Sequence, residues 1–519
     1  MAVRCAAVAA RQHEPVSAMG TWRIFAFAFF LMHASSGLDM TAQTSPDPGV
    51  IIIDGQAPSH PFPHFWERMF GSGRAILSLR DSYRRDLRAV KQITDFRYVR
   101  FHAILQDELG IYDEDAQGRS TYNFSYVDQI YDGLLAAGVR PFVEISFMPN
   151  KLAARQVLHT FWYKPNISPP KDWSTWADLI SAFTQHLVER YGIDEVAQWY
   201  FEVWNEPNLD FWAGEPKQST YWELYDRTAL AIKKVSPRLR VGGPATAQAA
   251  WVDDFIRHCV EKTIPVDFVS THVYANDPPQ GVFGLQADIP RDQMVGRAVR
   301  KVHDQIRASS LPALPLIWSE FNASYMTEPD VTDSIFMGPW LANMIRQCDG
   351  LVDIMSYWTF SDVFEEQGVV KTPFYGGYGL IANGGIPKPA FYAFELLHQL
   401  GDQRIQLDSD SALLTRKSDG ALVLALWNYA PPGETGSART MTLRLQHSNA
   451  KQASIFRVDR DHGDFHAAYE KMGTPRYPTQ AQIQELRTAT TLGLPQTVPI
   501  NGNLTVTLPA HGLAVIELK

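Results

Sequence analysis

The stretch FEVWNEPNLDFW, Phe201–Trp212, runs from an apolar segment directly into Asn205, Glu206 and Pro207. Continuous rather than alternating apolar residues are typical of a strand that is covered on both faces of a parallel sheet. In parallel α/β folds the residues that follow such strands carry the chemistry. The stretch therefore predicts a buried strand that ends in a candidate acid, and it directs attention to carboxyl groups at the ends of other strands.

Seven similar apolar runs occur along the chain, separated by longer amphipathic stretches. They are AILSL from Ala75, YVRFHAIL from Tyr98, RPFVEIS from Arg140, LRVGGP from Leu239, VDFVSTHVY from Val266, LPLIWSE from Leu314 and DIMSYWTF from Asp353. Eight repeats of strand and helix predict an α/β fold, a (β/α)8 TIM barrel over residues 75–400. A doubly wound open sheet is the alternative, but no glycine-rich phosphate turn follows the first strand.

One of the intervening stretches shows the helical pattern in detail. Trp222, Tyr225, Ala229 and Ile232 recur at helical spacing, so one face of this segment is apolar, as a helix covering a barrel requires. Ser219 or Thr220 is a candidate N-cap, and Pro237 is a candidate stop.

The hydrophobic pattern of the sequence changes after Leu400. TMTLRLQ from Thr440 and LTVTLPAHGLAVIEL from Leu504 alternate between apolar and polar residues, with turn residues between them. This period of two predicts an accessory C-terminal β-sandwich domain over residues 401–519. The N-terminal segment 43–74 contains VIIID, Val50–Asp54, which we expect to contribute a strand to the accessory sheet.

The first 42 residues have the order of a signal peptide. Arg4, Arg11 and Arg23 precede a nine-residue apolar run, residues 24–32, and small residues follow. The run is too short to span a bilayer, so we expect export to the bacterial periplasm or beyond the cell, with no membrane attachment after cleavage. The alternative is a disordered leader without a targeting role.

Composition excludes several classes of function. With 45% hydrophobic and 20% charged residues the chain is an ordinary globular protein, and its 519 residues suit a large domain with an appendage. A formal net charge of −9 without a concentrated Lys/Arg face argues against a nucleic-acid partner. Cys5, Cys259 and Cys348 form neither a metal-binding spacing nor a disulfide framework.

A second carboxyl group closes another predicted strand. Glu320 ends the seventh run, and strands four and seven of a closed barrel point into the same central mouth. Two carboxyl groups in one cleft divide acid and base roles, which is what the cleavage of a glycosidic bond requires. We therefore assign Glu206 as acid/base and Glu320 as nucleophile. The alternative for each glutamate is a helix cap or an ion-pair partner.

Further polar and aromatic residues surround the predicted mouth. Hydrogen-bonding groups at other strand ends suit a sugar, whereas no compact ligand spacing accompanies the histidines, so neither a metal nor a cofactor is expected. Glu144 and Glu202 lie inside strands and are interpreted as a buried polar network. The candidate ligands of the sugar at the strand ends are His102, Asn205, His272 and Tyr274.

Two long loops add candidate contacts. The segment HTFWYKPNISPPKDW, residues 159–173, follows the third strand, and its Phe161 and Trp162 are expected either to wall the pocket or to pack the loop. After the eighth strand, Glu365 and Glu366 could bind sugar hydroxyls. An acidic pair there would repel an anionic substrate, which favours a neutral sugar over a uronic acid.

At these residues the sequence resembles glycoside hydrolase family 39, and within it the bacterial β-xylosidases. The resemblance runs from about Gly71 to Leu400 and is carried by FEVWNEPN, RPFVEISFMP, VDFVSTHVY, WSEFNASY and SYWTFSDVFEE, the last of which contains Trp358. Ser319 stands where the family's nucleophile motif usually has threonine. The resemblance implies a retaining exo-β-1,4-xylosidase that releases xylose from the non-reducing ends of xylo-oligosaccharides. It also assigns His102, Asn205, His272, Tyr274 and Glu366 to the first sugar subsite, and Trp358 is a further candidate contact with the substrate.

Three alternatives remain at this point. An endo-acting polysaccharide hydrolase would have an open cleft rather than a blind pocket. An α-L-iduronidase-like glycosidase of the same family would need a cation for the substrate carboxylate, and Lys371 is the nearby candidate in the sequence. A non-catalytic carbohydrate-binding protein would keep aromatic residues without needing both glutamates.

Overall fold

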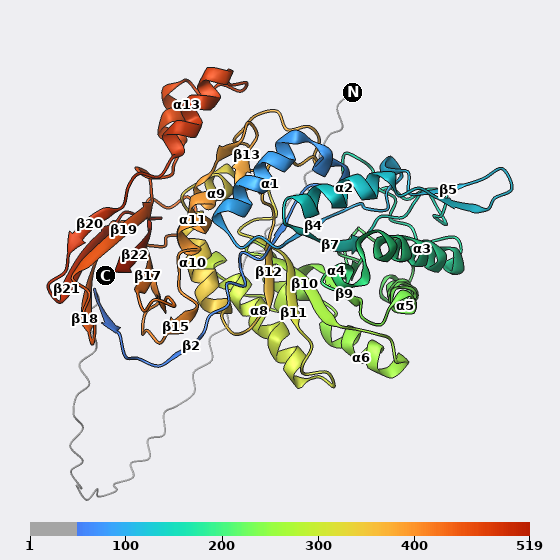
Figure 1. The fold of residues 1–519 in the computed structure, drawn as a ribbon, viewed down its shortest axis with the longest axis horizontal. Helices are drawn as coiled ribbons and strands as arrows, with labels where there is room; N and C mark the ends of the chain where they lie inside the picture. Colours follow the sequence, from blue (N-terminus) through green and yellow to red (C-terminus); the bar gives the residue numbers. More distant parts are fainter. Residues whose placement is uncertain (1–48) are drawn as a thin grey trace, which may run out of the picture. The chain divides into compact units, whose positions relative to one another are not determined.

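The computed structural model describes residues 49–519, so the predicted signal segment, residues 1–42, lies outside the described residues. Within residues 49–519, eight parallel strands close into a barrel, as predicted (Figure 1). Their side chains are buried almost throughout, which explains the continuous apolar runs in the sequence. The barrel strands are, in spatial order, β3 (Met69–Gly71), β4 (Tyr98–Phe101), β7 (Arg140–Ile145), β8 (Tyr200–Val203), β9 (Arg240–Thr246), β10 (Phe268–Tyr274), β11 (Leu316–Asn322) and β12 (Ile354–Tyr357).

The prediction of the first strand was wrong. AILSL forms the 3₁₀ helix η1 (Ala75–Leu79), and the first barrel strand is β3, inside the segment 43–74. Backbone bonds from Leu77 N–H to Arg74 C=O and from Arg80 N–H to Leu77 C=O close the tight turns of η1. A strand of three residues is too short for periodicity to reveal it. The barrel therefore begins before residue 75.

Helices alternate with the barrel strands and cover the outside of the barrel (Figure 1). The predicted helix in residues 217–235 is present as α5, but it begins directly after Pro216. The Thr220 hydroxyl donates to the Pro216 carbonyl at 2.8 Å inside the first turn, so neither Ser219 nor Thr220 is the N-cap. The helices that follow the eight strands in turn are α1 (Asp81–Ile93), α2 (Ser125–Ala136), α3 (Trp173–Tyr191), α5 (Lys217–Val235), α6 (Val252–Lys262), α8 (Arg291–Ala308), α10 (Met337–Cys348) and α11 (Pro389–Leu397).

Short elements decorate the loops of the barrel. Several of them follow strand ends and shape the loops that line the mouth. They are η2 (Asp107–Leu109), β5 (Tyr112–Glu114), β6 (Ser120–Tyr122), α4 (Ile193–Val196), η3 (Ala247–Ala249), α7 (Pro279–Phe283), α9 (Pro329–Thr332), β13 (Ile381–Ala382) and β14 (Ile386–Pro387).

Two further sheets form the accessory domain. A three-stranded sheet has the order β1-β18-β21, and β1 pairs in parallel with β18, as expected for the segment VIIID. The seven-stranded sheet has the order β2-β15-β16-β17-β22-β19-β20. The strands are β1 (Val50–Asp54), β2 (Ser59–Pro61), β15 (Gln403–Ile405), β16 (Ala412–Arg416), β17 (Leu422–Trp427), β18 (Arg439–Gln446), β19 (Gln452–Val458), β20 (Gln496–Pro499), β21 (Asn503–Leu508) and β22 (Leu513–Leu518).

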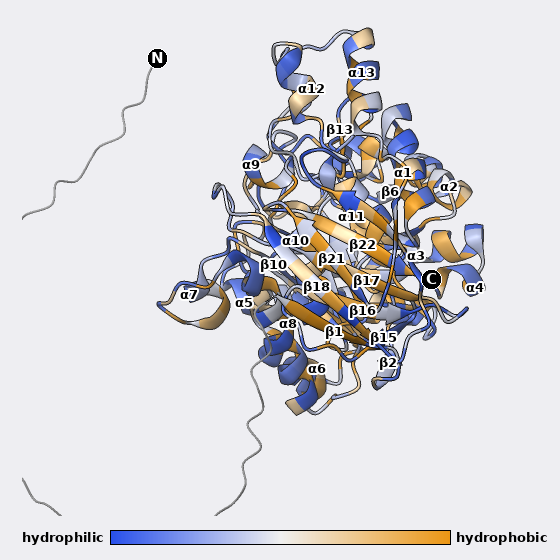
Figure 2. Cartoon of the chain, turned by 90° about the vertical axis from the view of Figure 1, so that its left-hand side faces the viewer, coloured by the Kyte–Doolittle hydropathy of each residue, from blue (hydrophilic) through white to orange (hydrophobic). Residues whose placement is uncertain are grey.

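The two sheets share one apolar core, which makes them a sandwich (Figure 2). Ile53 of β1, Leu443 of β18 and Leu424 of β17 belong to the same buried cluster. Residues on the other face of β17 and β22, such as Val423 and Val515, belong to the main core of the barrel, against α10 and α11. The seven-stranded sheet is thus apolar on both faces.

Two helices of the accessory domain were not anticipated. The helices α12 (His466–Lys471) and α13 (Gln480–Thr490) lie between β19 and β20.

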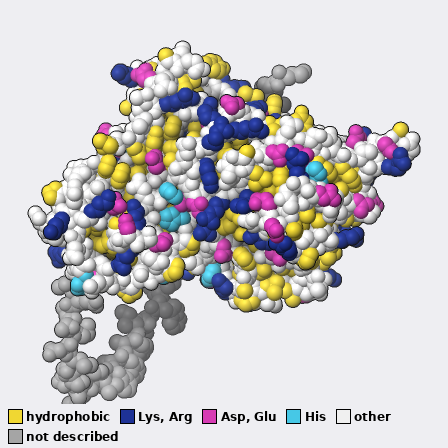
Figure 3. Space-filling model, viewed as in Figure 1, with side chains coloured by type: hydrophobic (Ala, Val, Ile, Leu, Met, Phe, Trp, Pro, Cys, Tyr) yellow, Lys and Arg dark blue, Asp and Glu magenta, His cyan; other side chains and the backbone are white. Residues whose placement is uncertain are grey.

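In the part of the chain that the structure describes, no helix is both long and apolar enough to cross a bilayer. On the face shown in Figure 3, basic and acidic side chains are interspersed over most of the surface.

Candidate active site

A cavity of about 420 Å³ opens at the carboxyl ends of the barrel strands. The strand ends bring together side chains that are far apart in the sequence, from the β4 end to the loop after β12. The cavity volume lies within the range of small-molecule sites. Nine of the predicted site residues line it: His102, Phe161, Asn205, Glu206, His272, Tyr274, Glu320, Trp358 and Glu366.

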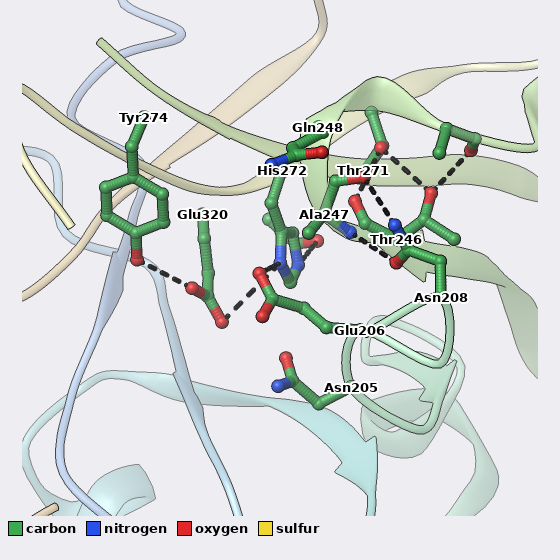
Figure 4. A network of polar contacts seen from close by, with 12 residues as sticks. Asn205, Glu206, Asn208, Thr246, Ala247, Gln248, Thr271, His272, Tyr274 and Glu320 are labelled. Carbon is green, nitrogen blue, oxygen red and sulfur yellow. Dashed lines mark hydrogen bonds and ion pairs between the residues drawn. The ribbon is translucent and has the colours of Figure 1, made fainter. Parts of the chain in front are cut away.

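The two predicted catalytic carboxyl groups face each other in this cavity (Figure 4). Glu206 follows β8, and Glu320 lies in β11. One oxygen of each carboxyl group and a ring nitrogen of His272 all lie within 4.8 Å of one another. Carboxyl groups about 5–5.5 Å apart serve a retaining glycosidase, whereas an inverting pair stands about 6.5–9.5 Å apart to admit a water. The close approach therefore supports the retaining geometry.

The backbone turn that presents Glu206 is held by its neighbours. Glu206 has a φ of 43°, in the left-handed region, and its N–H donates to the Ala245 carbonyl at 2.8 Å. Asn208 anchors the same turn, because its side chain accepts from Ala247 N–H at 2.9 Å and donates to Ala247 C=O at 3.0 Å (Figure 4). A left-handed residue at a functional site persists only where such contacts fix it.

Arg100 is the electrostatic centre of the site, and the sequence analysis did not identify it. The side chain is fully buried in β4. Its Nε donates to Glu202 Oε2 at 2.6 Å, its Nη1 to Glu320 Oε1 at 2.5 Å, and its Nη2 to Asn205 Oδ1 at 2.9 Å. Nη2 also lies 2.8 Å from Glu144 Oε2. One guanidinium thereby orients Glu320, the amide of Asn205 beside Glu206, and two carboxylates of the barrel interior.

A sequence signal for Arg100 exists. Arg100 lies in β4 and His102, two residues further on, directly follows the strand, so both side chains are expected on the same, inward face. Glu144 and Glu202 are partners in the register of β7 and β8. Buried carboxylates require a cation, and the arginine in an otherwise apolar strand was the available one. The interpretation of these two glutamates as a buried polar network agrees with these contacts.

The surroundings distinguish the two catalytic carboxyl groups. Glu320 receives hydrogen bonds from Arg100 and from the Tyr274 hydroxyl, at 2.8 Å for the latter, which stabilise a carboxylate. Burial raises the pKa of Glu206 well above its usual value, and repulsion from Glu320 and Asp277 raises it further. These different surroundings fit the predicted roles, with Glu206 as the acid and Glu320 as the nucleophile.

His272 connects the pair. Its Nδ1 lies 3.0 Å from Glu206 Oε1, and its Nε2 lies 3.1 Å from Ser319 Oγ. Burial lowers the pKa of His272 well below its usual value, and the nearby Arg100 adds to this effect. A neutral imidazole places no positive charge beside Glu206, so it does not counteract the raised pKa of the acid.

Glu366 and His102 form a second polar corner of the cavity. His102 Nδ1 lies 2.6 Å from Glu144 Oε2, while its Nε2 lies 3.5 Å from Glu366 Oε1. Burial raises the pKa of Glu366 to about 8, although the charge of His102 opposes the shift. Glu366 Oε1 is buried without a hydrogen-bond partner in the structure. Glu366 lines the cavity, and a neutral carboxyl group there is suited to bind a hydroxyl group.

Two of the predicted contacts, Trp162 and Glu365, lie outside the cavity lining. The Trp162 ring is 53% exposed and lies 5.7 Å from the guanidinium of Arg74. Glu365 accepts from Arg74 Nη1 at 3.0 Å and from Arg80 Nη1 at 2.6 Å. These arginines, at the start of the barrel, hold Glu365 and leave its neighbour Glu366 to face the cavity.

Further lining residues were missed because they lie on loops without a distinctive pattern. Phe211 packs against Phe161 with ring centres 5.3 Å apart, and His159 stacks on Phe211 at 4.1 Å. Phe161 thus both walls the pocket and packs its loop. The Trp358 ring packs against Gly71 of β3 so closely that a Cβ at Gly71 would collide with it. The lining residues that the sequence analysis did not name are Leu209, Phe211, Ala247, Gln248, Asp277, Pro278, Tyr325, Gln367 and Tyr378.

Two groups of side chains within residues 49–519 have the composition of metal ligands. One is the catalytic group Glu206, His272 and Glu320. The other is His64, Glu67 and His398, in which both imidazoles bond to the buried Glu67 carboxylate at 2.7–2.9 Å. In the first group Glu206 bonds to His272, while Glu320 accepts from Arg100 and Tyr274 outside the group, so side chains of the protein already partner each carboxyl group.

A barrel with two facing carboxyl groups at its strand ends, one anionic and one of raised pKa, defines a glycoside hydrolase of the retaining type. Residues 50–505 match the model of glycosyl hydrolases family 39, and the chain belongs to this family. The family assignment also confirms the resemblance recognised in the sequence.

Known proteins resemble the chain over most of its length. It is 40% identical over 443 residues to a beta-xylosidase of Geobacillus stearothermophilus, covering 82% of this chain and 86% of that protein. It is 34% identical over 446 residues to a beta-xylosidase of Caldicellulosiruptor saccharolyticus, covering 82% and 88%. The crystal structure of a monomeric beta-xylosidase from Caulobacter crescentus CB15 superposes with a TM-score of 0.81 at 36% identity, covering 91% and 99%.

Proposed function

We propose that this protein is a retaining exo-β-1,4-xylosidase that releases xylose from the non-reducing ends of xylo-oligosaccharides. The observation that carries the proposal is the pairing of Glu206 and Glu320 within 4.8 Å in one cavity. Two relatives with 34–40% identity over most of both chains are named beta-xylosidases, which supports the choice of sugar.

The geometry supports a double displacement. Glu206 donates its proton to the glycosidic oxygen as that oxygen leaves, and a Glu320 oxygen forms a bond to the anomeric carbon. The leaving chain departs with a free hydroxyl, and the sugar remains as an ester of Glu320. The Glu206 carboxylate then takes a proton from a water, whose oxygen attacks the anomeric carbon and breaks the ester bond. Glu320 is released as a carboxylate, and Glu206 is protonated again.

The charge of the cavity favours a neutral sugar over a uronic acid. In the described part of the chain, the cavity lining contains no lysine or arginine side chain. Arg100 lies beneath the lining and is already bonded to protein carboxylates. Lys371, the candidate cation for an iduronidase-like substrate, lines a neighbouring cavity instead. A substrate carboxylate would face Glu366 and Asp277 without a counter-ion, which disfavours the iduronidase-like alternative.

A panel of nitrophenyl glycosides and xylotetraose tests the proposal. We expect turnover of the β-D-xyloside well above that of the other glycosides, and xylose as the first product from xylotetraose. Early release of xylobiose or xylotriose in place of xylose would indicate the endo-acting alternative. No turnover of any glycoside would indicate the non-catalytic carbohydrate-binding alternative.

Variants of the two glutamates test their roles. Glu320→Gln removes the nucleophile, so turnover should be lost on every substrate. Glu206→Ala should lower kcat about 10²–10⁴-fold on xylobiose, and much less on a dinitrophenyl xyloside whose leaving group needs little protonation. Glu223→Gln, an exposed glutamate on α5, is the control. Equal losses on both substrates in Glu206→Ala would contradict the acid role.

We also propose that the protein is exported to the periplasm or secreted. Support comes from the basic residues and the short apolar run in the first 42 residues. The test is the N-terminal mass of the protein recovered from the periplasm of a bacterial host. Recovery from the cytoplasm with an intact N-terminus would contradict the proposal.

A further inference from the structure

A second large cleft lies away from the catalytic cavity. It has a volume of about 600 Å³ and is lined by α8, by the end of α10, by the edge strand β2 and by its neighbour β15. None of its lining residues lines the catalytic cavity. Its charged side chains are Arg297, Arg300, Arg346, Arg404, His60 and Asp349.

The cleft carries an excess of positive charge in a protein of net charge −9. Arg297 and Arg300 are exposed on one face of α8, and among the described residues neither forms an ion pair. Arg346 lies 3.3 Å from Asp410, whose side chain is fully exposed. The guanidinium groups of Arg297 and Arg300 are thus available to an anion, whereas Arg346 also donates to Asn343. Guanidinium binds carboxylate and phosphate with matching geometry.

Asp349 adds a hydrogen-bond acceptor without a partner. Its side chain is 4% exposed, and its Oδ2 lies 2.7 Å from both His60 Nε2 and Arg404 Nη1. Its Oδ1 is buried and has no hydrogen-bond partner in the structure. A buried acceptor without a partner is costly, so a ligand that donates a hydroxyl group there would bind favourably.

These features restrict the ligand. It must bring a negative group to the arginines and a hydroxyl donor to Asp349. The lining has no Phe, Tyr or Trp, on which a neutral oligosaccharide or a nucleobase would stack. Inorganic phosphate would place negative oxygens close to the Asp349 carboxylate, which is unfavourable. A sugar carboxylate satisfies both requirements.

We propose that this cleft binds the uronic acid unit of an acidic oligosaccharide. The sugar carboxylate pairs with Arg297 and Arg300, and a ring hydroxyl donates to Asp349. The catalytic cavity disfavours a sugar carboxylate. It therefore favours neutral sugars, whereas this cleft favours acidic ones. This binding function does not depend on the proposed xylosidase activity.

Titration calorimetry with the full chain tests the proposal with D-glucuronate, D-glucose and inorganic phosphate. Glucose is the matched neutral probe, because it differs from glucuronate only at the carboxylate carbon. We expect saturable binding of glucuronate that weakens as salt is raised, and weaker binding of the other two probes. The double variant Arg297→Gln, Arg300→Gln should weaken glucuronate binding by at least about tenfold.

The control is Arg88→Gln, which removes an equally exposed arginine from α1 and should leave glucuronate binding unchanged. Circular dichroism shows whether each variant is folded. Absence of glucuronate binding, phosphate or glucose binding as tight as that of glucuronate, or an unchanged affinity in the folded double variant would each overturn the proposal.

Discussion

Asp277 offers a direct test of how the pocket sets the protonation of Glu206. Both side chains line the cavity, and repulsion from Asp277 is one of the causes that raise the pKa of Glu206. Burial raises the pKa of Asp277 itself to about 6, so above that pH Asp277 is negatively charged. The variant Asp277→Asn removes this charge and keeps the shape of the side chain.

The magnitude follows from Coulomb's law. Two unit charges about 8 Å apart interact by about 2 kcal/mol at an effective dielectric constant of about 20, which corresponds to between one and two pKa units. Solvent at the mouth reduces this, so we expect a shift of about one unit. Without the repulsion, the pKa of Glu206 falls. Glu206 then loses its proton at lower pH, and the basic limb of the pH profile moves to lower pH.

The assay is the pH dependence of kcat/KM for a nitrophenyl xyloside, which reports the ionisation of the free enzyme. The local fold should be retained in Asp277→Asn, because the amide oxygen of the new side chain can still accept from Tyr274 N–H, which lies 2.7 Å from the Asp277 carboxylate. Asp210→Asn is the matched control: Asp210 lies on the loop after Glu206, but its side chain is fully exposed, so solvent screens its charge. An unmoved basic limb in Asp277→Asn, or an equal shift in Asp210→Asn, would refute the electrostatic explanation.

Three other predictions follow from the contacts. Glu366→Gln mimics the neutral form of Glu366, whose pKa of about 8 keeps it protonated near pH 7, so KM near pH 7 should change little. In the wild type KM should rise above pH 8 as Glu366 loses its proton, and this rise should be absent in the variant. A rise that persists in the variant would contradict this. Ile53→Ala, in the fully buried sandwich core, should lower the free energy of unfolding in urea by about 2–5 kcal/mol, whereas Ile52→Ala, on the same strand but 45% exposed, should change it by less than about 0.5 kcal/mol. Dialysis against EDTA should leave kcat/KM unchanged, since Arg100 already neutralises Glu320, and activity restored only by a divalent cation would contradict this.

Most of the fold prediction rested on the pattern of apolar runs in the sequence. Strands β4 and β7 to β12 are buried on both faces, so each produced a continuous apolar run that could be recognised. Strand β3 has only three residues and was not recognised. AILSL is apolar because η1 packs on the core, and it was therefore mistaken for a strand. An apolar run shows that a segment is buried. In a run of five residues it does not distinguish a strand from a 3₁₀ helix.

The candidate site could be predicted where a residue closes a strand, and less well elsewhere. Glu206, Glu320 and His272 were placed by the barrel geometry alone. Trp162 and Glu365 are each adjacent to a residue that does face the cavity, Phe161 and Glu366. On a loop, sequence cannot decide which of two neighbours points inward. The contacts of Arg74 with Glu365 and of its guanidinium with the Trp162 ring decide it here.

The charges of the site explain why a buried pair of carboxyl groups can hold two protonation states. Arg100 bonds to Glu320 but not to Glu206, so the cation stabilises the nucleophile as an anion. That anion in turn raises the pKa of Glu206, as does burial, and neutral His272 adds no opposing charge. The position of one guanidinium on β4, which bonds to Glu320 and not to Glu206, therefore accounts for the proposed division of roles, with Glu320 as the nucleophile and Glu206 as the proton donor.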